Sequence, residues 1–111
     1  MEIRTVAQEF FLTPSLRDHL ESRLRSAFSS LRDRIASICV VLRELNQDGG
    51  RRNMVCEVNV DIPGQPHVVI RDAQEDIYYA IDNAIKRAAY RAVRIMACGK
   101  AVVGLEMPRL R

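Results

Sequence analysis

The sequence predicts an α+β fold, a two-layer sandwich in the order β-α-β-β-β-α with two helices on one face of a four-stranded mixed sheet. Three observations support this fold class. Apolar residues recur at helical spacing over 71–96, they alternate with polar residues over 53–62, and Thr13 and Pro14 precede a second helical pattern. A chain of 111 residues forms one domain and can bury a two-layer core without disulfides or metals.

The amino-terminal part predicts a strand followed by a helix. Residues 2–8 are short and lean towards β structure, which indicates a first strand. Thr13 is a favourable N-cap and Pro14 suits the first helical position, so a helix begins there and runs to about Leu31. Its core-facing stripe follows three- and four-residue steps through Leu16, Leu20, Leu24, Ala27, Phe28 and Leu31.

The middle of the chain predicts three strands joined by short turns. Residues 35–45 are rich in β-branched side chains, 46–50 form a turn, and 63–66 form a second turn before a short strand at 67–71. Between the turns, one strand face carries Met54, Cys56, Val58, Val60 and Ile62. The two strands flanking the first helix should form a right-handed crossover unit. The three later strands should form an antiparallel meander with one face buried and the other in solvent.

The last helix is predicted over 71–96. Asp72 would cap it, with Glu75 three residues later as in a capping box, and Cys98–Gly99 would end it. Its apolar stripe consists of Ile77, Ile81, Ala84, Ile85, Ala88, Ala92, Ile95 and Met96. We therefore predict a domain at 1–97 and a flexible tail at 98–111.

The same helix has a cationic face. At about 100° per residue, its cations share an arc roughly 140° wide with no carboxylate at the positions between them. These cations are Lys86, Arg87, Arg91 and Arg94. Such a face suits RNA phosphates, as does an excess of 15 arginines over 2 lysines, because guanidinium binds phosphate in a bidentate way. A solvated helix face and a GC-rich genome explain these features equally well. Further RNA-binding candidates are Arg51 and Arg52 in the first hairpin and Arg17 and Arg23 in the first helix.

No catalytic or metal site is predicted. The sequence has three cysteines, an odd number without CxxC spacing: Cys39, Cys56 and Cys98. We therefore expect them to be small buried residues rather than zinc ligands or disulfides. His19 and His67 have no nucleophile near them in the sequence, and we expect both to be plain surface residues. The glycines occupy turns rather than a phosphate-binding loop. We therefore expect no enzyme, no cofactor and no small-molecule substrate.

Free thiols favour a reducing compartment. The first ten residues lack the apolar core of a signal peptide, and no apolar run reaches membrane-spanning length. We therefore expect a soluble cytoplasmic protein without a membrane partner.

Three segments carry a resemblance to a known family. The run DIYYAIDNAIKRAAYRAVR contains, in order, Asp76, Ile77, Tyr78, Ala80, Ile81 and Asp82. The run LTPSLRDHLESRLRSAF contains Thr13, Leu16 and Arg17, and RIASICVVLREL has an Arg-Ile pair followed by an apolar strand. Over roughly residues 1–96 the sequence resembles the short hibernation-promoting and ribosome-associated inhibitor proteins of the sigma-54 modulation protein family.

The resemblance implies a stress-related bacterial protein that binds 16S-type ribosomal RNA of the small ribosomal subunit near the decoding centre. It would block the tRNA and mRNA sites sterically. The fold would be similar to double-stranded-RNA-binding domains with an added strand, and the absence of the dimerising domain of long relatives implies a monomer off the ribosome. The resemblance implies RNA contacts at Arg23, Arg87 and Arg94, with Lys86 and Arg91 supplementing them.

Two departures from the family support an alternative. Many members carry a basic residue where this chain has Tyr90, and their lysine-rich helix end is replaced here by residues 95–98. The first hypothesis is a ribosome-associated translation inhibitor or hibernation factor. The alternative is a protein-interaction or regulatory module of the same fold with weak or no RNA binding, because an exposed apolar end at Ile95 and Met96 would attract a protein partner.

Overall fold

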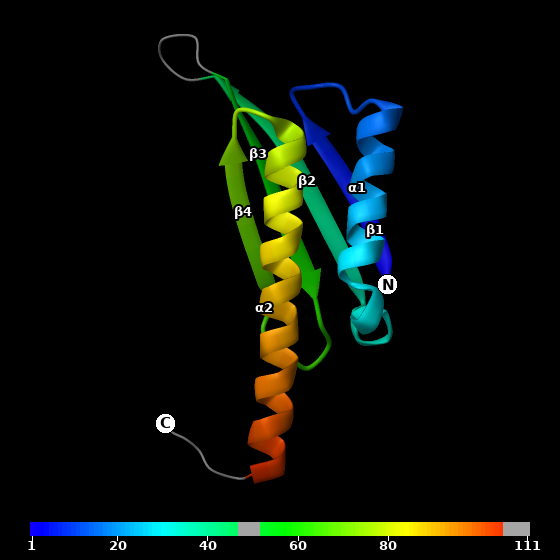
Figure 1. Ribbon diagram of the computed structural model, residues 1–111, viewed down its shortest axis with the longest axis vertical. Helices are drawn as coiled ribbons and strands as arrows, with labels where there is room; N and C mark the ends of the chain where they lie inside the picture. Colours follow the sequence, from blue (N-terminus) through cyan, green and yellow to red (C-terminus); the bar gives the residue numbers. More distant parts are fainter. Residues whose placement is uncertain (47–51, 106–111) are drawn as a thin grey trace.

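The structure, a computed structural model, describes the backbone of residues 1–46 and 52–105 and the side chains of residues 1–45 and 53–97. The elements in chain order are β1 (Glu2–Gln8), α1 (Pro14–Ala27), the 3₁₀ helix η1 (Ser29–Arg34), β2 (Ser37–Asn46), β3 (Arg52–Asp61), β4 (Val68–Gln74) and α2 (Ile77–Leu105). Both α-helices lie on the same side of the sheet (Figure 1). The predicted α+β two-layer fold is therefore confirmed.

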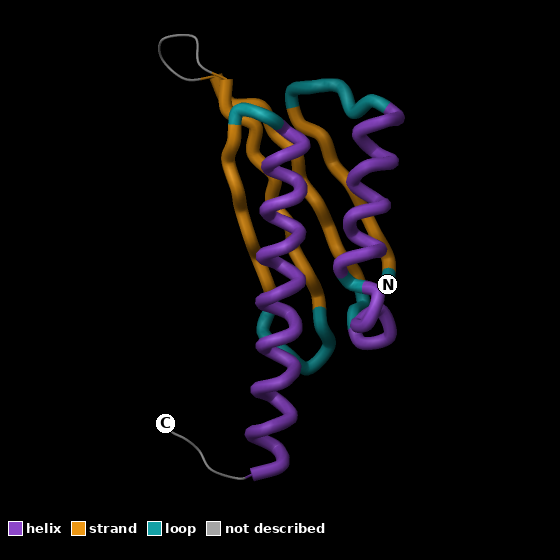
Figure 2. The backbone as a smooth tube through the Cα atoms, viewed as in Figure 1, coloured by secondary structure: helices purple, strands orange, loops and turns teal. Residues whose placement is uncertain are grey.

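The four strands form one sheet in the order β1-β2-β3-β4. β1 pairs in parallel with β2, and α1 connects them on one side of the sheet (Figure 2). The β2–β3 and β3–β4 pairs are antiparallel. The predicted antiparallel meander is present. The crossover from β1 through α1 to β2 is also present, but it is not right-handed as predicted: with the helices in front and β1 running upward, β2 lies to the left of β1 (Figure 1), so the crossover is left-handed. β1 and β4 are the two edge strands.

The core lies between the sheet and the two helices. The helix stripes contribute Leu16, Leu20, Leu24 and Phe28 from α1 and Ile81, Ala84, Ile85, Ala88, Ala92 and Met96 from α2, all buried. From β3 and its end, Cys56, Val58, Val60 and Ile62 face the helices, as the alternation predicts. Burial of this apolar surface is the main stabilising contribution, at about 25 cal/mol per Å².

The outer face of the sheet is less open to water than predicted. Val55 has the outward phase, yet it is only 3% exposed. Its register partner on β2 is Arg43, whose Nε is buried and has no hydrogen-bond partner among the described residues. Nearby, Glu57 accepts hydrogen bonds from Arg71 at 2.8 Å and from Asn59 at 3.1 Å, and these bonds lower the pKa of the Glu57 carboxyl. Side chains of the outer face therefore shield one another, which a period-two pattern cannot reveal.

Helix α1 begins where predicted and ends earlier. The Thr13 hydroxyl accepts a hydrogen bond from the Leu16 amide at 3.2 Å, so Thr13 is the N-cap. The helix ends at Ala27, and the Phe28 amide donates to the Leu24 carbonyl as the C-cap. The following 29–34 segment is a 3₁₀ helix rather than a continuation of α1. Two serines there compete for backbone hydrogen bonds, which weakens the α-helix.

The predicted start of the last helix is wrong. β4 continues to Gln74, which is paired with Met54, and α2 begins at Ile77. Asp76, rather than Asp72, accepts a hydrogen bond from the Tyr78 amide at the helix start. The ladder with β3 keeps Asp72 in the strand, because β3 is long enough to pair as far as Gln74.

The predicted end of this helix is also wrong, since α2 continues beyond Cys98–Gly99 to Leu105. A single glycine weakens a helix by about 1 kcal/mol relative to alanine, which does not suffice to end one. No proline follows until Pro108, so nothing in the sequence forces the chain out of the helix earlier. Residues 106–111 of the predicted tail lie outside the described residues.

The Cys56 thiol should make the free energy of unfolding depend on pH in the alkaline range. Burial, together with the nearby Asp72 and Glu57 carboxylates, raises the pKa of the Cys56 thiol from 9.0 to about 12. Because the unfolded thiol ionises first, the free energy of unfolding should fall as pH rises from about 9 towards 12, by up to about 1.4 kcal/mol per pH unit. The Cys56→Ala variant should show a shallower fall in urea unfolding at successive pH values.

The Val58→Ala variant is the matched control, because it removes volume from the same buried strand face and no titratable group. It should be less stable than the parent protein at every pH and keep the parent slope. Parallel profiles for the parent protein and Cys56→Ala would contradict the role of this thiol.

Candidate nucleic-acid interface

A groove runs between α2 and the edge strand β4. It encloses about 870 Å³ and is lined by Ile70, Asn83, Lys86, Arg87, Tyr90, Arg91, Arg94 and Ile95. Four of the eight predicted RNA-binding residues therefore line the same groove. Ile70 from β4 and Ile95 from α2 contribute apolar surface, and the cations surround it.

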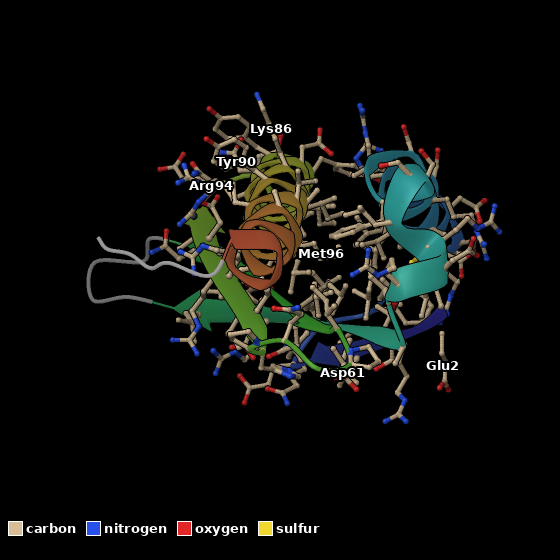
Figure 3. All side chains as sticks on the ribbon, turned by 90° about the horizontal axis from the view of Figure 1, so that it is seen from below. Glu2, Asp61, Lys86, Tyr90, Arg94 and Met96 are labelled. Carbon is tan, nitrogen blue, oxygen red and sulfur yellow. The ribbon has the colours of Figure 1, made fainter. Side chains whose placement is uncertain are left out.

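Helical spacing explains why these residues converge. Lys86, Tyr90 and Arg94 are four residues apart, so they lie in one row along the helix. Figure 3 shows these three side chains on one side of α2, whereas Met96 lies on the side that faces the core. The buried stripe of α2 thus determines the direction in which these three side chains point.

Arg87 is held by acidic and carbonyl oxygens of β4. One of its guanidinium nitrogens lies 3.3 Å from Oδ1 of Asp72 and 3.3 Å from the main-chain oxygen of Arg71. The Asp72 side chain is only 14% exposed, so this ion pair is partly shielded from water. The predicted absence of carboxylates at the positions between the cations holds along the helix. The acid that pairs with Arg87 comes from another element, β4.

The sequence contains a signal for Asp72 that the helix assignment obscured. Over 68–74, the buried positions Val68 and Ile70 alternate with exposed ones, and Asp72 has the same inward phase. An inward carboxylate at an edge strand requires a cationic partner. A strand assignment up to Gln74 would therefore have predicted a cation above Asp72.

Arg94 lies against the ring of Tyr90. Its guanidinium carbon is 5.7 Å from the ring centroid, and one of its nitrogens donates to the Tyr90 hydroxyl at 3.3 Å. Tyr90 is nevertheless 65% exposed. The pair presents an oriented aromatic surface within the groove.

Lys86 and Arg91 are the open cations of the groove. Both are exposed, and no ion pair joins either of them to an acidic side chain within the described part of the chain. They can therefore bind an external anion without first releasing an internal partner. This distinguishes them from Arg87.

The two cations predicted on α1 lie apart from this groove. Arg23 forms an ion pair with Asp82 of α2, with Nε 3.3 Å from Oδ1, and Arg17 is exposed on α1. Arg51 lies outside the described residues, and only the backbone of Arg52 is described, at the start of β3. The predicted RNA contacts at these four positions stay predictions.

His19 is not a plain surface residue, contrary to the prediction. Its Nε2 lies 2.8 Å from Oδ1 of Asp82, and its ring packs edge-on against Tyr78 with centroids 4.9 Å apart. Asp82 thus joins His19 and Arg23 of α1 to α2. Sequence reasoning missed this role because the two partners are 63 positions apart. His67 is exposed, as predicted.

Other kinds of site receive no support from the described residues. Within them, no group of three or more histidine, cysteine, aspartate or glutamate side chains could hold a metal ion. Cys39 and Cys56 are free thiols. None of the helices in the described part of the chain is both long and apolar enough to span a bilayer.

Two solved structures share this fold. The structure of a ribosomal subunit interface protein from Coxiella burnetii matches with a TM-score of 0.74 and 22% identity, over 87% of this chain and 99% of that chain, and shows the fold alone. The crystal structure of the N-terminal domain of Protein Y from Thermus thermophilus matches with a TM-score of 0.68 and 26% identity, over 85% and 98% of the two chains.

The family model gives the narrower assignment. Residues 3–96 match the sigma 54 modulation protein / S30EA ribosomal protein family, and the chain therefore belongs to this family of ribosome-associated proteins. The resemblance seen in the sequence is confirmed. Among curated protein sequences, none matches the chain significantly.

The contact between Asp72 and Arg87 should stabilise the position of α2 over β4. A double-mutant cycle with Asp72→Ala and Arg87→Ala should give a coupling energy of about 0.5–1.5 kcal/mol in urea unfolding, because the carboxylate is shielded and the guanidinium is half exposed. The same cycle with Asp72→Ala and Lys86→Ala is the control and should give nearly zero. Equal coupling in both cycles would mean that the ion pair has no specific role.

Proposed function

We propose that the protein is a translation inhibitor or hibernation factor that binds ribosomal RNA of the small subunit through the groove between α2 and β4. The observation that carries this proposal is the pair of open cations, Lys86 and Arg91, beside the Tyr90 ring. Ribosomal RNA has an anionic phosphate backbone. Each cation that neutralises one of its phosphates releases counterions, and this release favours binding. Family membership supplies the ribosome as the place where such a surface would act.

The proposed mechanism is steric. Near the decoding centre, the domain would occupy the space that mRNA and tRNA need, so translation stops without any chemical step. A domain of this size would bind as a monomer and without a cofactor, in the cytoplasm, where ribosomes are. Arg17 and Arg23 on α1, together with Arg51 and Arg52, would supply further phosphate contacts.

Charge reversal in the groove tests the proposal. The double variant Lys86→Glu, Arg91→Glu should bind purified small subunits at least about 10-fold more weakly in sedimentation assays, because phosphates would then face carboxylates. Binding of the parent protein should weaken with added salt, with a slope of roughly −0.7 to −0.9 in log–log form per phosphate contacted. An in vitro translation reaction should show the same loss of inhibition.

The matched control is Arg25→Glu, Arg32→Glu, which changes the net charge equally at exposed positions of α1 and η1 away from the groove. It should sediment with small subunits like the parent protein. If both double variants lose binding equally, only net charge matters and the groove is not the binding surface. If neither does, the proposed interface is wrong.

The alternative function, a protein-interaction module, has a different basis from the one expected. Met96 is buried, so the predicted exposed apolar patch at Ile95 and Met96 is absent. At the other end of the molecule, Glu9 has a left-handed φ of 67°, and Phe11, two residues later, is 77% exposed. Phe11 lines a pocket whose walls are both apolar and acidic. Aromatic side chains are enriched at protein–protein interfaces, so Phe11 is the candidate anchor for a protein partner.

Nuclease treatment separates the two functions. If the protein is an interaction module, a partner captured from lysate should survive nuclease and be lost from the Phe11→Ser variant. Phe11 is so exposed that the substitution should leave the thermal unfolding midpoint nearly unchanged. Capture that depends on intact RNA and is unaffected by Phe11→Ser would refute this alternative.

A further inference from the structure

We propose that Tyr90 and Arg94 form a stacking platform for an unpaired RNA base, so that the groove selects single-stranded or looped RNA over duplex RNA. This inference rests on the proposed function and specifies the form of RNA that the groove recognises.

The Tyr90 ring is held in an orientation that favours stacking. Tyr90 is 65% exposed, and the Arg94 guanidinium both donates to its hydroxyl at 3.3 Å and lies 5.7 Å from the ring centroid. An exposed tyrosine normally samples several rotamers, and a partner on the same helix four residues later restricts them. A ring held in place loses less conformational entropy when a base stacks on it.

The chemistry around the ring matches a nucleotide. Lys86 precedes Tyr90 by one helical turn and Arg94 follows it by one turn, so a cationic residue flanks Tyr90 on each side along the helix. Ile70 and Ile95 line the groove with apolar surface, and the Asn83 amide can both donate and accept hydrogen bonds. A nucleotide matches all three features, with an aromatic base, polar base edges and an anionic phosphate.

Duplex RNA fits this groove less well than an unpaired nucleotide. In A-form RNA the bases are stacked inside the helix, and a protein contacts mostly phosphates and 2′-hydroxyls. Such a ligand would use Lys86 and Arg91 and leave the Tyr90 ring without a partner. An acidic peptide would likewise use the cations and offer no base to stack. An unpaired nucleotide engages the cations and the ring together.

Fluorescence anisotropy with two labelled RNAs tests the inference on the full chain. The probes are a single strand of roughly 12 nucleotides without self-complementarity and the blunt duplex that it forms with its complement. The parent protein should bind the single strand more tightly. Tyr90→Ala should weaken binding of the single strand about 5- to 150-fold, as loss of one stacked base does, and leave duplex binding unchanged.

Tyr90→Phe is the matched control, because it keeps the ring and loses only the hydroxyl that bonds to Arg94. It should retain single-strand affinity to within about threefold, since the bond lost is exposed and the ring remains. Tyr90→Ala should also keep the salt dependence of the parent protein, whereas Arg91→Gln should lower its log–log slope by about 0.7 on the single strand.

Several results would overturn the inference. They are equal binding of the two RNAs by the parent protein, no measurable binding of either, an equal loss for both RNAs in Tyr90→Ala, or an equal loss in Tyr90→Phe and Tyr90→Ala. If Tyr90→Ala is without effect while Lys86→Glu, Arg91→Glu releases the protein from small subunits, the stacking platform fails and the proposed function stands. If that double variant still sediments with small subunits, the proposed function fails instead.

Discussion

The packing of α2 on the inner face of the sheet is the interaction on which the rest of this structure depends. Ala84, Ala88 and Ala92 are fully buried, and their small side chains allow the helix to lie close to β3 and β4. Close packing of one face determines the direction of every other side chain on the helix. As a result, the cations beside this face line the groove between α2 and β4, where Asp72 pairs with Arg87.

The sequence reveals the fold because its two periodicities are clear where the core forms. The three- and four-residue steps of both helices and the alternation of β3 correspond to most of the buried residues observed. One exception is the end of the predicted first-helix stripe, where Ala27 is exposed and Leu31 is only partly buried in η1. Element boundaries are harder to predict where two local signals compete. Asp72 with Glu75 has the pattern of a helix cap, yet pairing with β3 keeps Asp72 in a strand, because ladder hydrogen bonds between distant segments outweigh a local capping preference.

The candidate interface is predictable only in part for the same reason. The spacing of Lys86, Arg87, Arg91 and Arg94 correctly places all four along one groove. It cannot show that Asp72 pairs with Arg87, or that Asp82 receives both Arg23 and His19, because these acids are brought near their partners by tertiary structure. Cations of one helix face therefore differ in their availability, and the difference depends on residues in other elements.

The position of β4 at the edge of the sheet has a consequence for self-association. An edge strand exposes unpaired backbone groups on which the strand of another molecule can assemble. Here the Arg87 guanidinium donates to the main-chain oxygen of Arg71, and a row of further cations, Lys86, Arg91 and Arg94, lines the groove beside the same strand. Two such edges would bring like charges together, which disfavours edge-to-edge aggregation. A polyanion that neutralises this row would remove that protection, so solubility at low salt should depend on how much of the row is occupied.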